Sequence, residues 1–211
     1  MNSTYIMSVR IIFVRHGETA DNVGKVNGGS LPTPLTEKGR LQARKAGVWL
    51  RETMDERIDI AFVSDIRRAR ETAEEILKMY PLVQVKHDAR IRETSFGILE
   101  GSPAGTKRKE ADRLGIPFVE FRPQGGESLI DLRKRVHAFL DEVTCSYQGK
   151  TVLVVSHGGP ITNMLMEILE FQDIWQEYDK HHPHNTAITI LEIDKDKTHR
   201  LHVLNSLEHL A

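Results

Sequence analysis

The chain has 211 residues, of which 39% are hydrophobic and 28% charged, with 29 Lys and Arg against 30 Asp and Glu. This is the composition of an ordinary globular protein, so we expect one domain over residues 1–211. A net charge of −1 excludes a molecule-wide field that would hold nucleic acid or an anionic membrane. Any anion-binding site must therefore be local.

The single cysteine and the N-terminal residues bear on the compartment. Cys145 alone cannot form an intrachain disulfide or a cysteine-based zinc site, which favours a reducing environment, and we expect its side chain to be buried. Residues 1–8 lack the basic and apolar regions of a secretory signal, and no run of about 18 apolar residues occurs. We therefore expect a cytoplasmic protein with no membrane partner.

The first half of the chain alternates strand and helix patterns. Strands are expected over 9–14, 58–63 and 83–86, and the first of them is a run of β-branched and aromatic residues typical of a strand buried on both faces. A Gly- and Pro-rich loop over 22–34 precedes a helix that begins at Thr36 and runs to about Met54. Ser64 and Asp65 are expected to cap a second helix. Its buried face is predicted at Ala69, Ala73, Ile76 and Tyr80.

The second half begins with a break in this pattern. Gly, Pro and charged residues dominate 100–126, which predicts a lid-like insertion at about 101–124 with a short helix over 106–114. An amphipathic helix follows from 129 to near 149, with its apolar stripe at Leu129, Leu132, Val136, Leu140 and Val143. Further strands are expected over 151–155, 186–193 and 201–204. The alternation predicts an α/β three-layer sandwich with a mostly parallel central sheet flanked by helices.

Two of the predicted strands end in the same way. The strand over 9–14 runs into Arg15 and His16, and the strand over 151–155 runs into Ser156 and His157. Ligands of open α/β sheets bind beyond the carboxyl ends of the strands. A lone histidine is more often a satisfied polar residue than a catalyst. Because two strands of the same chain end in a histidine, we nevertheless predict that the two imidazoles meet at one edge of the sheet.

The string Arg15-His16-Gly17-Glu18-Thr19 resembles the signature of the histidine phosphatase superfamily, also called phosphoglycerate-mutase-like. Further blocks similar to those of the family follow in its order, over 34–39, 64–73, 91–101, 125–128 and 156–159. Three stretches, over 88–101, 121–128 and 204–210, look like those of TIGAR-type fructose-2,6-bisphosphatases. One departure is Asn27 before Gly28, where many members carry Gln-Gly. The resemblance implies a phosphoglycerate-mutase-like fold.

The resemblance also implies roles for individual residues. The catalytic residues would be His16 as nucleophile, Glu93 as general acid and His157 as the second histidine. Phosphate binding would fall to Arg15, Asn22, Arg68, Gly28 and Gly158, with Arg67 as a solvent-facing neighbour. No metal ligand and no cofactor is implied.

These residue types suit a phosphomonoester, which carries nearly two negative charges at neutral pH. Arginine stays charged and binds two phosphate oxygens at once, so Arg15 and Arg68 can hold the phosphoryl group without a metal. An unprotonated nitrogen of His16 would attack phosphorus and form a phosphohistidine. Glu93 would protonate the departing alkoxide and later deprotonate the attacking water.

The function expected is that of a phosphoric monoester hydrolase of the histidine acid phosphatase type. Its substrates would be small phosphorylated metabolites: sugar phosphates, bisphosphates such as fructose 2,6-bisphosphate, or phosphoglycerates. A phosphoglycerate mutase is the nearer alternative, although mutases usually carry a longer insertion and a closing tail. An inactive module that binds phosphorylated ligands is the other, against which the retained nucleophile and acid argue. We expect a monomer or a homodimer.

Other features receive less functional weight. The histidines at 181, 182 and 184 resemble a metal cluster, but Pro183 breaks helical spacing and no acidic or cysteine partner lies at a usual distance. This loop is better placed at the rim of the pocket, because the segment 185–187 resembles one beside the family's site. Five basic residues are expected to form a solvated face, unless some reach over the pocket to hold a second phosphate or an acidic group: Lys107, Arg108, Lys109, Arg113 and Arg122. Trp49 is expected to pack in the core.

Overall fold

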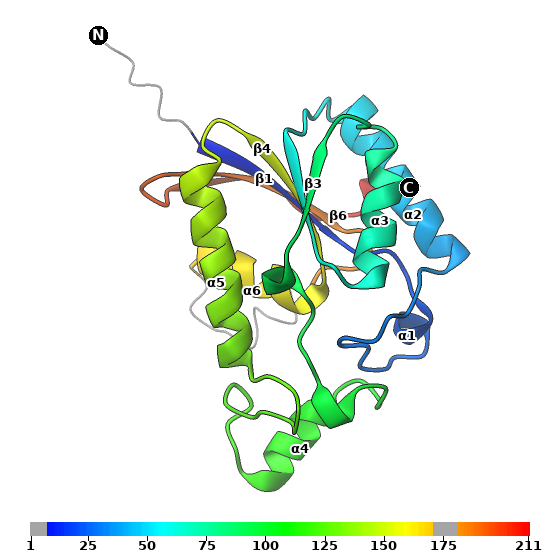
Figure 1. Ribbon diagram of the computed structural model, residues 1–211, viewed down its shortest axis with the longest axis vertical. Helices are drawn as coiled ribbons and strands as arrows, with labels where there is room; N and C mark the ends of the chain where they lie inside the picture. The colour runs from blue at the N-terminus through cyan, green and yellow to red at the C-terminus, as the bar shows by residue number, and fades with distance from the viewer. Residues whose placement is uncertain (1–7, 171–180) are drawn as a thin grey trace.

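The computed structural model describes residues 8–170 and 181–211 (Figure 1). Its strands form one sheet in the order β3-β2-β4-β1-β5-β6. They are β1 (Ser8–Arg15), β2 (Ile60–Val63), β3 (Gln84–His87), β4 (Thr151–Ser156), β5 (Ile188–Asp194) and β6 (His199–Ser206). Strands β1 to β4 are mutually parallel, whereas β5 and β6 add an antiparallel hairpin. The predicted mostly parallel sheet is confirmed.

Helices cover both faces of this sheet (Figure 1). The longer helices are α2 (Glu37–Val48), α3 (Arg67–Leu77), α4 (Thr106–Leu114), α5 (Leu129–Ser146) and α6 (Gly158–Ile168). Short turns complete the set: α1 (Ala20–Val23), η1 (Trp49–Thr53), η2 (Ala89–Ile91), η3 (Gly97–Leu99) and η4 (Glu208–Leu210). Side chains alternate across β1, so Phe13 packs with α5 and α6 while Val14 packs with α2 and α3. The three-layer sandwich is therefore confirmed.

The predicted buried faces of α3 and α5 are confirmed: all nine side chains predicted there are buried, although Tyr80 lies after the end of α3. Two local predictions are wrong. The N-cap of α3 is Ile66, which caps the helix without a side-chain hydrogen bond, while the Ser64 hydroxyl contacts the Ile66 amide at 3.3 Å and His157 Nε2 at 2.8 Å. Cys145 is exposed, because it lies two residues past Val143 and so on the opposite side of α5 from the apolar stripe.

The 101–124 segment, which contains α4, extends beyond the carboxyl ends of the parallel strands (Figure 1). The chain enters and leaves it where Gly97 crosses Gly126. Gly97 has φ +53°, and a Cβ there would lie 2.1 Å from the carbonyl oxygen of Gln124. A Cβ on Gly126 would lie 2.7 Å from the Ser95 carbonyl oxygen. Only glycine allows the two backbones to approach this closely, so the base of the segment is closed by backbone contact.

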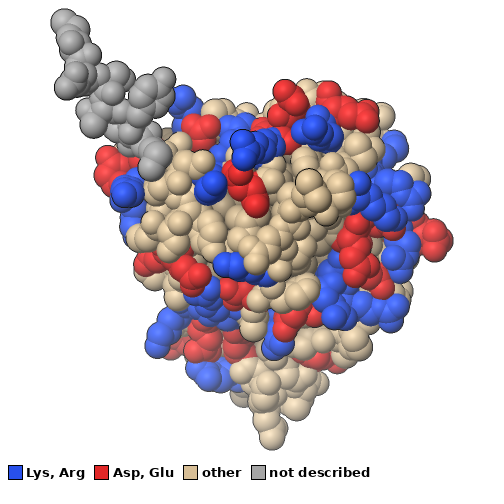
Figure 2. Space-filling model, turned by 45° about the horizontal axis from the view of Figure 1, so that its top comes forward, with Lys and Arg blue, Asp and Glu red and all other residues tan. Residues whose placement is uncertain are grey.

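Charge is mixed over the surface in view in Figure 2, where acidic and basic side chains alternate and do not separate by sign. This pattern agrees with the net charge of −1. Within residues 8–170 and 181–211, no helix has the length and apolar character needed to cross a membrane.

Candidate active site

The two histidines meet at the carboxyl ends of neighbouring strands. β1 pairs with β4 so that Arg15 lies opposite Ser156, and the His16 amide donates to the Ser156 carbonyl at 2.9 Å. The ring centroids of His16 and His157 are 5.2 Å apart, and the two residues are 2% and 0% exposed. The predicted meeting of the imidazoles is confirmed, and it follows from the register of two parallel strands.

Hydrogen bonds define which nitrogen of His16 carries the proton. Nδ1 lies 2.8 Å from the carbonyl oxygen of Gly17, which can only accept, so Nδ1 is the donor. The other nitrogen, Nε2, accepts a hydrogen bond from Arg68 Nε at 3.2 Å. Burial, followed by the charges of Arg68 and Arg15, lowers the pKa of His16 well below its ordinary value. The ring is therefore neutral at neutral pH, with a lone pair on Nε2.

His157 is packed beside His16 and held by a serine. Its Nε2 is 2.8 Å from Ser64 Oγ, while its Nδ1 is buried and has no hydrogen-bond partner among the residues that the structure describes. Burial is the main reason that the pKa of His157 also lies well below its ordinary value, with Arg68 second. Because buried polar atoms normally have partners, Nδ1 is the ring nitrogen of His157 left for a ligand.

Arg68 is buried on α3, and backbone oxygens fix its guanidinium. Nη2 donates to the Gly29 carbonyl at 2.7 Å, and Nη1 donates to the Leu31 carbonyl at 3.1 Å. Burial lowers the pKa of Arg68, but a guanidinium stays protonated in proteins. Arg15, the last residue of β1, donates from Nη1 to the Pro183 carbonyl at 2.6 Å. Both cations are thus oriented by main-chain acceptors.

Glu93 follows η2 and is held by α5. Arg135 donates to the carbonyl oxygens of Arg90 at 2.6 Å and Glu93 at 3.1 Å, and it pairs with Glu127 at 2.5 Å. A Cβ on Gly159 would lie 2.5 Å from Glu93 Oε1. Glycine at this position lets the carboxyl group approach the first turn of α6. Glu93 is therefore fixed through its backbone from one side and accommodated by a glycine on the other.

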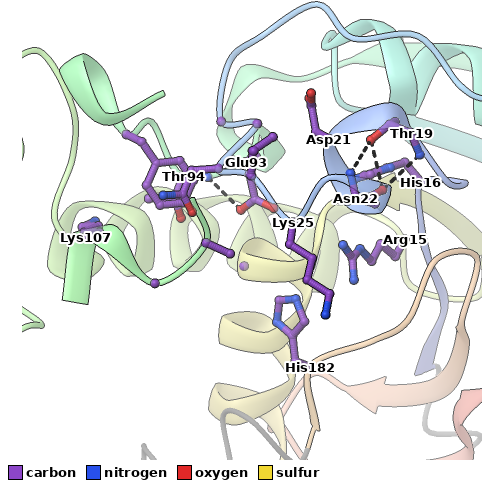
Figure 3. A pocket seen from close by; sticks show the side chains of 18 of the residues that line it. Arg15, His16, Thr19, Asp21, Asn22, Lys25, Glu93, Thr94, Lys107 and His182 are labelled. Atoms are coloured by element: carbon purple, nitrogen blue, oxygen red, sulfur yellow. Dashed lines mark hydrogen bonds between the residues drawn. The ribbon is translucent and has the colours of Figure 1, made fainter. Parts of the chain in front are cut away.

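These groups surround a hollow of about 980 Å³, drawn in Figure 3. Most of the predicted site residues line it, namely Arg15, His16, Asn22, Gly28, Arg68 and Glu93. His157 and Gly158 are not among the lining residues. The ring of His182 packs on Gly158, where a Cβ would lie 2.3 Å from its Cε1. Gly159 lines the hollow instead, so the phosphate contact predicted at Gly158 is not exposed to it.

Three asparagines organise the rim of the hollow. Asn22 Oδ1 accepts from the Thr19 amide at 3.1 Å and from Asn185 Nδ2 at 2.9 Å, which leaves its own NH₂ group as the donor available to a ligand. Asn185 Nδ2 also donates to the His16 carbonyl at 3.0 Å. Asn27 donates to Ser102 Oγ at 3.0 Å, so this departure from Gln-Gly ties the rim to the 101–124 segment.

The basic residues of the 101–124 segment divide into two groups. Lys109, Arg113 and Arg122 are exposed, as predicted for a solvated face, with Arg113 and Arg122 in surface ion pairs. Lys107 and Arg108 line the hollow, and Lys107 is only 3% exposed. The charge run of α4 shows no apolar periodicity, which is why the sequence pattern alone did not single out Lys107. Lys25, from the loop after α1, also projects into the hollow (Figure 3).

A buried turn supports the strand end from behind. Thr186 has φ +58°, and its amide donates to the Arg15 carbonyl at 3.0 Å. Its hydroxyl donates to the Asn185 carbonyl, so it accepts from His209 Nε2 at 2.9 Å. His209 Nδ1 is buried with no hydrogen-bond partner in the described part of the chain. Burial lowers the pKa of His209 to about 4.

The loop 181–184 lies at the rim, as predicted. His182 lines the hollow, and Pro183 receives the Arg15 hydrogen bond. No group of three or more His, Cys, Asp or Glu side chains among residues 8–170 and 181–211 is arranged to hold a metal ion. The segment 185–187 leads directly into β5 beside the site.

Comparisons with known proteins agree with this geometry. Residues 11–206 match the profile of the Histidine phosphatase superfamily (branch 1). The chain is 30% identical to a probable phosphatase of Schizosaccharomyces pombe over 208 residues, which cover 96% of this chain and 95% of that protein. It is 37% identical to the fructose-2,6-bisphosphatase TIGAR of Bos taurus over 132 residues, 61% of this chain and 48% of that protein.

A solved structure shares both fold and sequence with the chain. The mycobacterial glucosyl-3-phosphoglycerate phosphatase is 29% identical, with a TM-score of 0.78 over 94% of this chain and 99% of that one. With its paired histidines, its arginines and a matched region that spans most of its length, this chain belongs to the histidine phosphatase superfamily, branch 1.

Proposed function

We propose that this protein is a metal-independent phosphomonoesterase of the histidine acid phosphatase type that acts on small phosphorylated metabolites. One observation carries the proposal: a neutral, buried His16 presents the lone pair of Nε2 beside the Arg68 guanidinium, in a hollow that Glu93 also lines. A nucleophile, a phosphate-binding cation and a carboxyl group in one cavity are the parts that phosphoryl transfer to histidine requires.

In the first step, His16 Nε2 attacks phosphorus while the bond from phosphorus to the leaving oxygen breaks. Arg15 and Arg68 stabilise the charge on the phosphoryl oxygens and supply what a metal ion would otherwise supply, while Asn22 contributes a neutral donor. Glu93 gives its proton to the departing alkoxide, which is a poor leaving group. The products of this step are the free alcohol, a phosphohistidine and the Glu93 carboxylate.

In the second step, water replaces the alcohol. The Glu93 carboxylate accepts a proton from that water as its oxygen bonds to phosphorus, and the bond from phosphorus to His16 Nε2 breaks. Inorganic phosphate leaves, and both His16 and Glu93 regain their starting protonation states. His157 assists when the bound dianion favours protonation of its ring, because Nδ1 then has a proton to donate to the phosphoryl group.

The names of the relatives support the substrate class. They describe phosphatases of fructose 2,6-bisphosphate and of a glucosylated phosphoglycerate. We therefore propose phosphorylated sugars and glycerates as substrates. We further propose that the 101–124 segment acts as the lid over the leaving-group end of the hollow.

The test is phosphate release from a panel of sugar and glycerate phosphates in the presence of a chelator. Wild-type protein is expected to release phosphate, and His16→Ala to release none. The matched control is His199→Ala, which removes an exposed histidine of β6 and is expected to retain activity. Quenching with alkaline detergent during turnover should trap a phosphoryl group on His16 that is stable in base and is lost on acid treatment. Isomerised product without free phosphate would indicate a mutase, and binding without turnover would indicate an inactive module.

A further inference from the structure

Lys107 occupies an unusual position for a lysine. It is 3% exposed, yet it lines the hollow, and its Nζ donates a single hydrogen bond within the described chain, to the Glu127 carbonyl at 2.7 Å. Nζ also lies 5.8 Å from the ring centroids of both Phe96 and Phe118. An ammonium has three N–H donors, so two of them have no protein acceptor among these residues.

A charge buried in this way is costly. Taking an ammonium out of water is compensated only by several hydrogen bonds or by a close opposite charge, and Lys107 has one carbonyl, two aromatic faces and carboxylates with which it forms no ion pair within the described residues. This is reflected in the pKa of Lys107, which burial lowers to about 8 even though three carboxylates raise it: Glu127, Asp131 and Glu93. A negatively charged group in the hollow would supply what the protein leaves out.

The whole lining of the hollow favours anions beyond the one phosphoryl group. It includes five basic side chains and two carboxylates, although the chain has a net charge of −1. Arg15 and Arg68 are engaged by the phosphoryl group under the proposed function. The remaining cations are Lys25, whose amine ends near His182 in Figure 3, and Lys107 and Arg108, which belong to the 101–124 segment. Two of these three cations therefore lie in the segment that would cover the leaving group.

Figure 3 shows in which direction the leaving group would extend from the phosphoryl group. Lys107 lies on the opposite side of the view from Arg15 and His16, with Glu93 between them. A leaving oxygen next to Glu93 would therefore have the phosphoryl group on one side and the body of the leaving group on the Lys107 side. A hollow of about 980 Å³ is at the upper end of the range for small-molecule sites and accommodates a metabolite larger than phosphate.

We propose that Lys107 forms a second anion subsite, which selects phosphomonoesters whose leaving group carries a further carboxylate or phosphate. This inference rests on the proposed phosphatase function and adds the substrate feature that the protein reads. The Phe96 and Phe118 rings exclude water around the ammonium, so that an anion meeting it is bound more strongly than at an exposed lysine.

The experiment uses two pairs of substrates that differ in the distal group. In the carboxylate pair, 3-phosphoglycerate is compared with glycerol phosphate, which has an alcohol in place of the acid. In the phosphate pair, fructose 1,6-bisphosphate is compared with fructose 1-phosphate. The quantity measured is the ratio of kcat/KM for the charged substrate to kcat/KM for its neutral counterpart. The pair with the larger ratio identifies which anion fits the subsite.

The variant is Lys107→Met, which keeps the length and apolar character of the side chain. It is expected to lower the ratio about tenfold or more for the preferred pair, the effect of losing a charge-assisted hydrogen bond. Lys109→Met is the matched control on the same helix, because Lys109 is exposed and does not line the hollow. Its ratio should equal that of the wild type.

The outcomes separate the two proposals. Equal loss for both members of each pair would assign Lys107 a structural role and overturn the subsite, as would an unchanged ratio. Absence of phosphate release from all four substrates by the wild type would instead refute the phosphatase function. Turnover of all four substrates that depends on His16 but not on Lys107 would overturn the subsite and leave the phosphatase function standing.

A pH series gives a second readout. The groups that face the Lys107 ammonium are Glu127, Asp131 and Glu93, together with Arg108 beside it. Above about pH 8 the free protein loses this charge, so the wild-type ratio should fall as pH rises through that value. In Lys107→Met the ratio should be flat over the same range, and a parallel fall in both proteins would overturn the subsite.

Discussion

The hollow has two halves that the chain builds by different means. The strand-end half is lined by Arg15, His16 and Arg68, with His157 packed against His16, and parallel strands and main-chain acceptors hold these residues in place. The insertion half consists of Phe96, Lys107, Arg108 and Phe118, which side-chain contacts hold together. We infer that the strand-end half carries out phosphoryl transfer and that the insertion half selects the leaving group.

The largest effect should come from the strand-end half. Arg68→Met removes the donor to His16 Nε2 and a phosphate-binding cation, so kcat should fall about a hundredfold or more for every substrate. This uniform loss contrasts with the selective loss expected for Lys107→Met. Steady-state kinetics on the four substrates measures both. The control is Arg67→Met, whose guanidinium is on the surface and pairs with Glu71. A larger loss in the control would contradict the assignment.

Glu93 lies between the two halves. The loss of turnover caused by its substitution should depend on how much the leaving group needs a proton. Glu93→Gln keeps the size of the side chain but removes the proton, so turnover of alkyl phosphates should fall about a hundredfold or more. Turnover of p-nitrophenyl phosphate should fall far less, because its leaving group needs no proton. Comparing kcat for the two esters tests this, with the exposed Glu120→Gln as control. Equal losses would remove Glu93 from the acid role.

The smallest effect concerns the support behind the strand end. The pKa of His209 is about 4 in the folded protein and about 6.5 in an unfolded chain, so folding favours its neutral form. Its contribution to stability is complete above pH 6.5 and is lost as pH falls toward 4, by about 1 to 2 kcal/mol after allowance for solvent. His209→Gln keeps a donor for Thr186 but does not titrate. Urea unfolding at several pH values should show a flatter profile for this variant.

The matched control for that profile is His199→Gln on the exposed face of β6. It should retain the pH dependence of the wild type. If His209→Gln also retains it, the acid sensitivity comes from other groups, and the turn at Thr186 contributes no titrating support.

The sequence predicted the strand-end half well because its positions follow from local signals. Continuous apolar runs marked β1 and β4, and parallel pairing then brought His16 and His157 together. Ile66 as the cap of α3 was missed because the Ser64 hydroxyl lies between the Ile66 amide and His157, and the second of these contacts joins distant elements. Gly159 replaces Gly158 for a similar reason, since the His182 ring arrives from the far end of the chain.

The insertion half was not predicted because its buried residues do not recur at a helical or strand spacing in the sequence. Lys107 and Lys109 are alike in sequence context, both lying in the same charged stretch. Only the packing of Phe96 and Phe118 around one of them separates the buried ammonium from the solvated one. For Cys145 the error was the reverse: burial was predicted from the residue type, but the side chain lies on the exposed side of α5.

The crossing of Gly97 and Gly126 has a consequence for how such a protein can be altered. The backbones that enter and leave the segment touch directly at Gly97 and Gly126. The side chains of the segment are therefore not needed to hold its two ends together. The sequence of residues 101–124 can thus be exchanged as a unit. New leaving-group preferences could be installed by changing its sequence, provided that both glycines stay, that Phe118 and Val119 still pack on the core, and that Ser102 still accepts from Asn27.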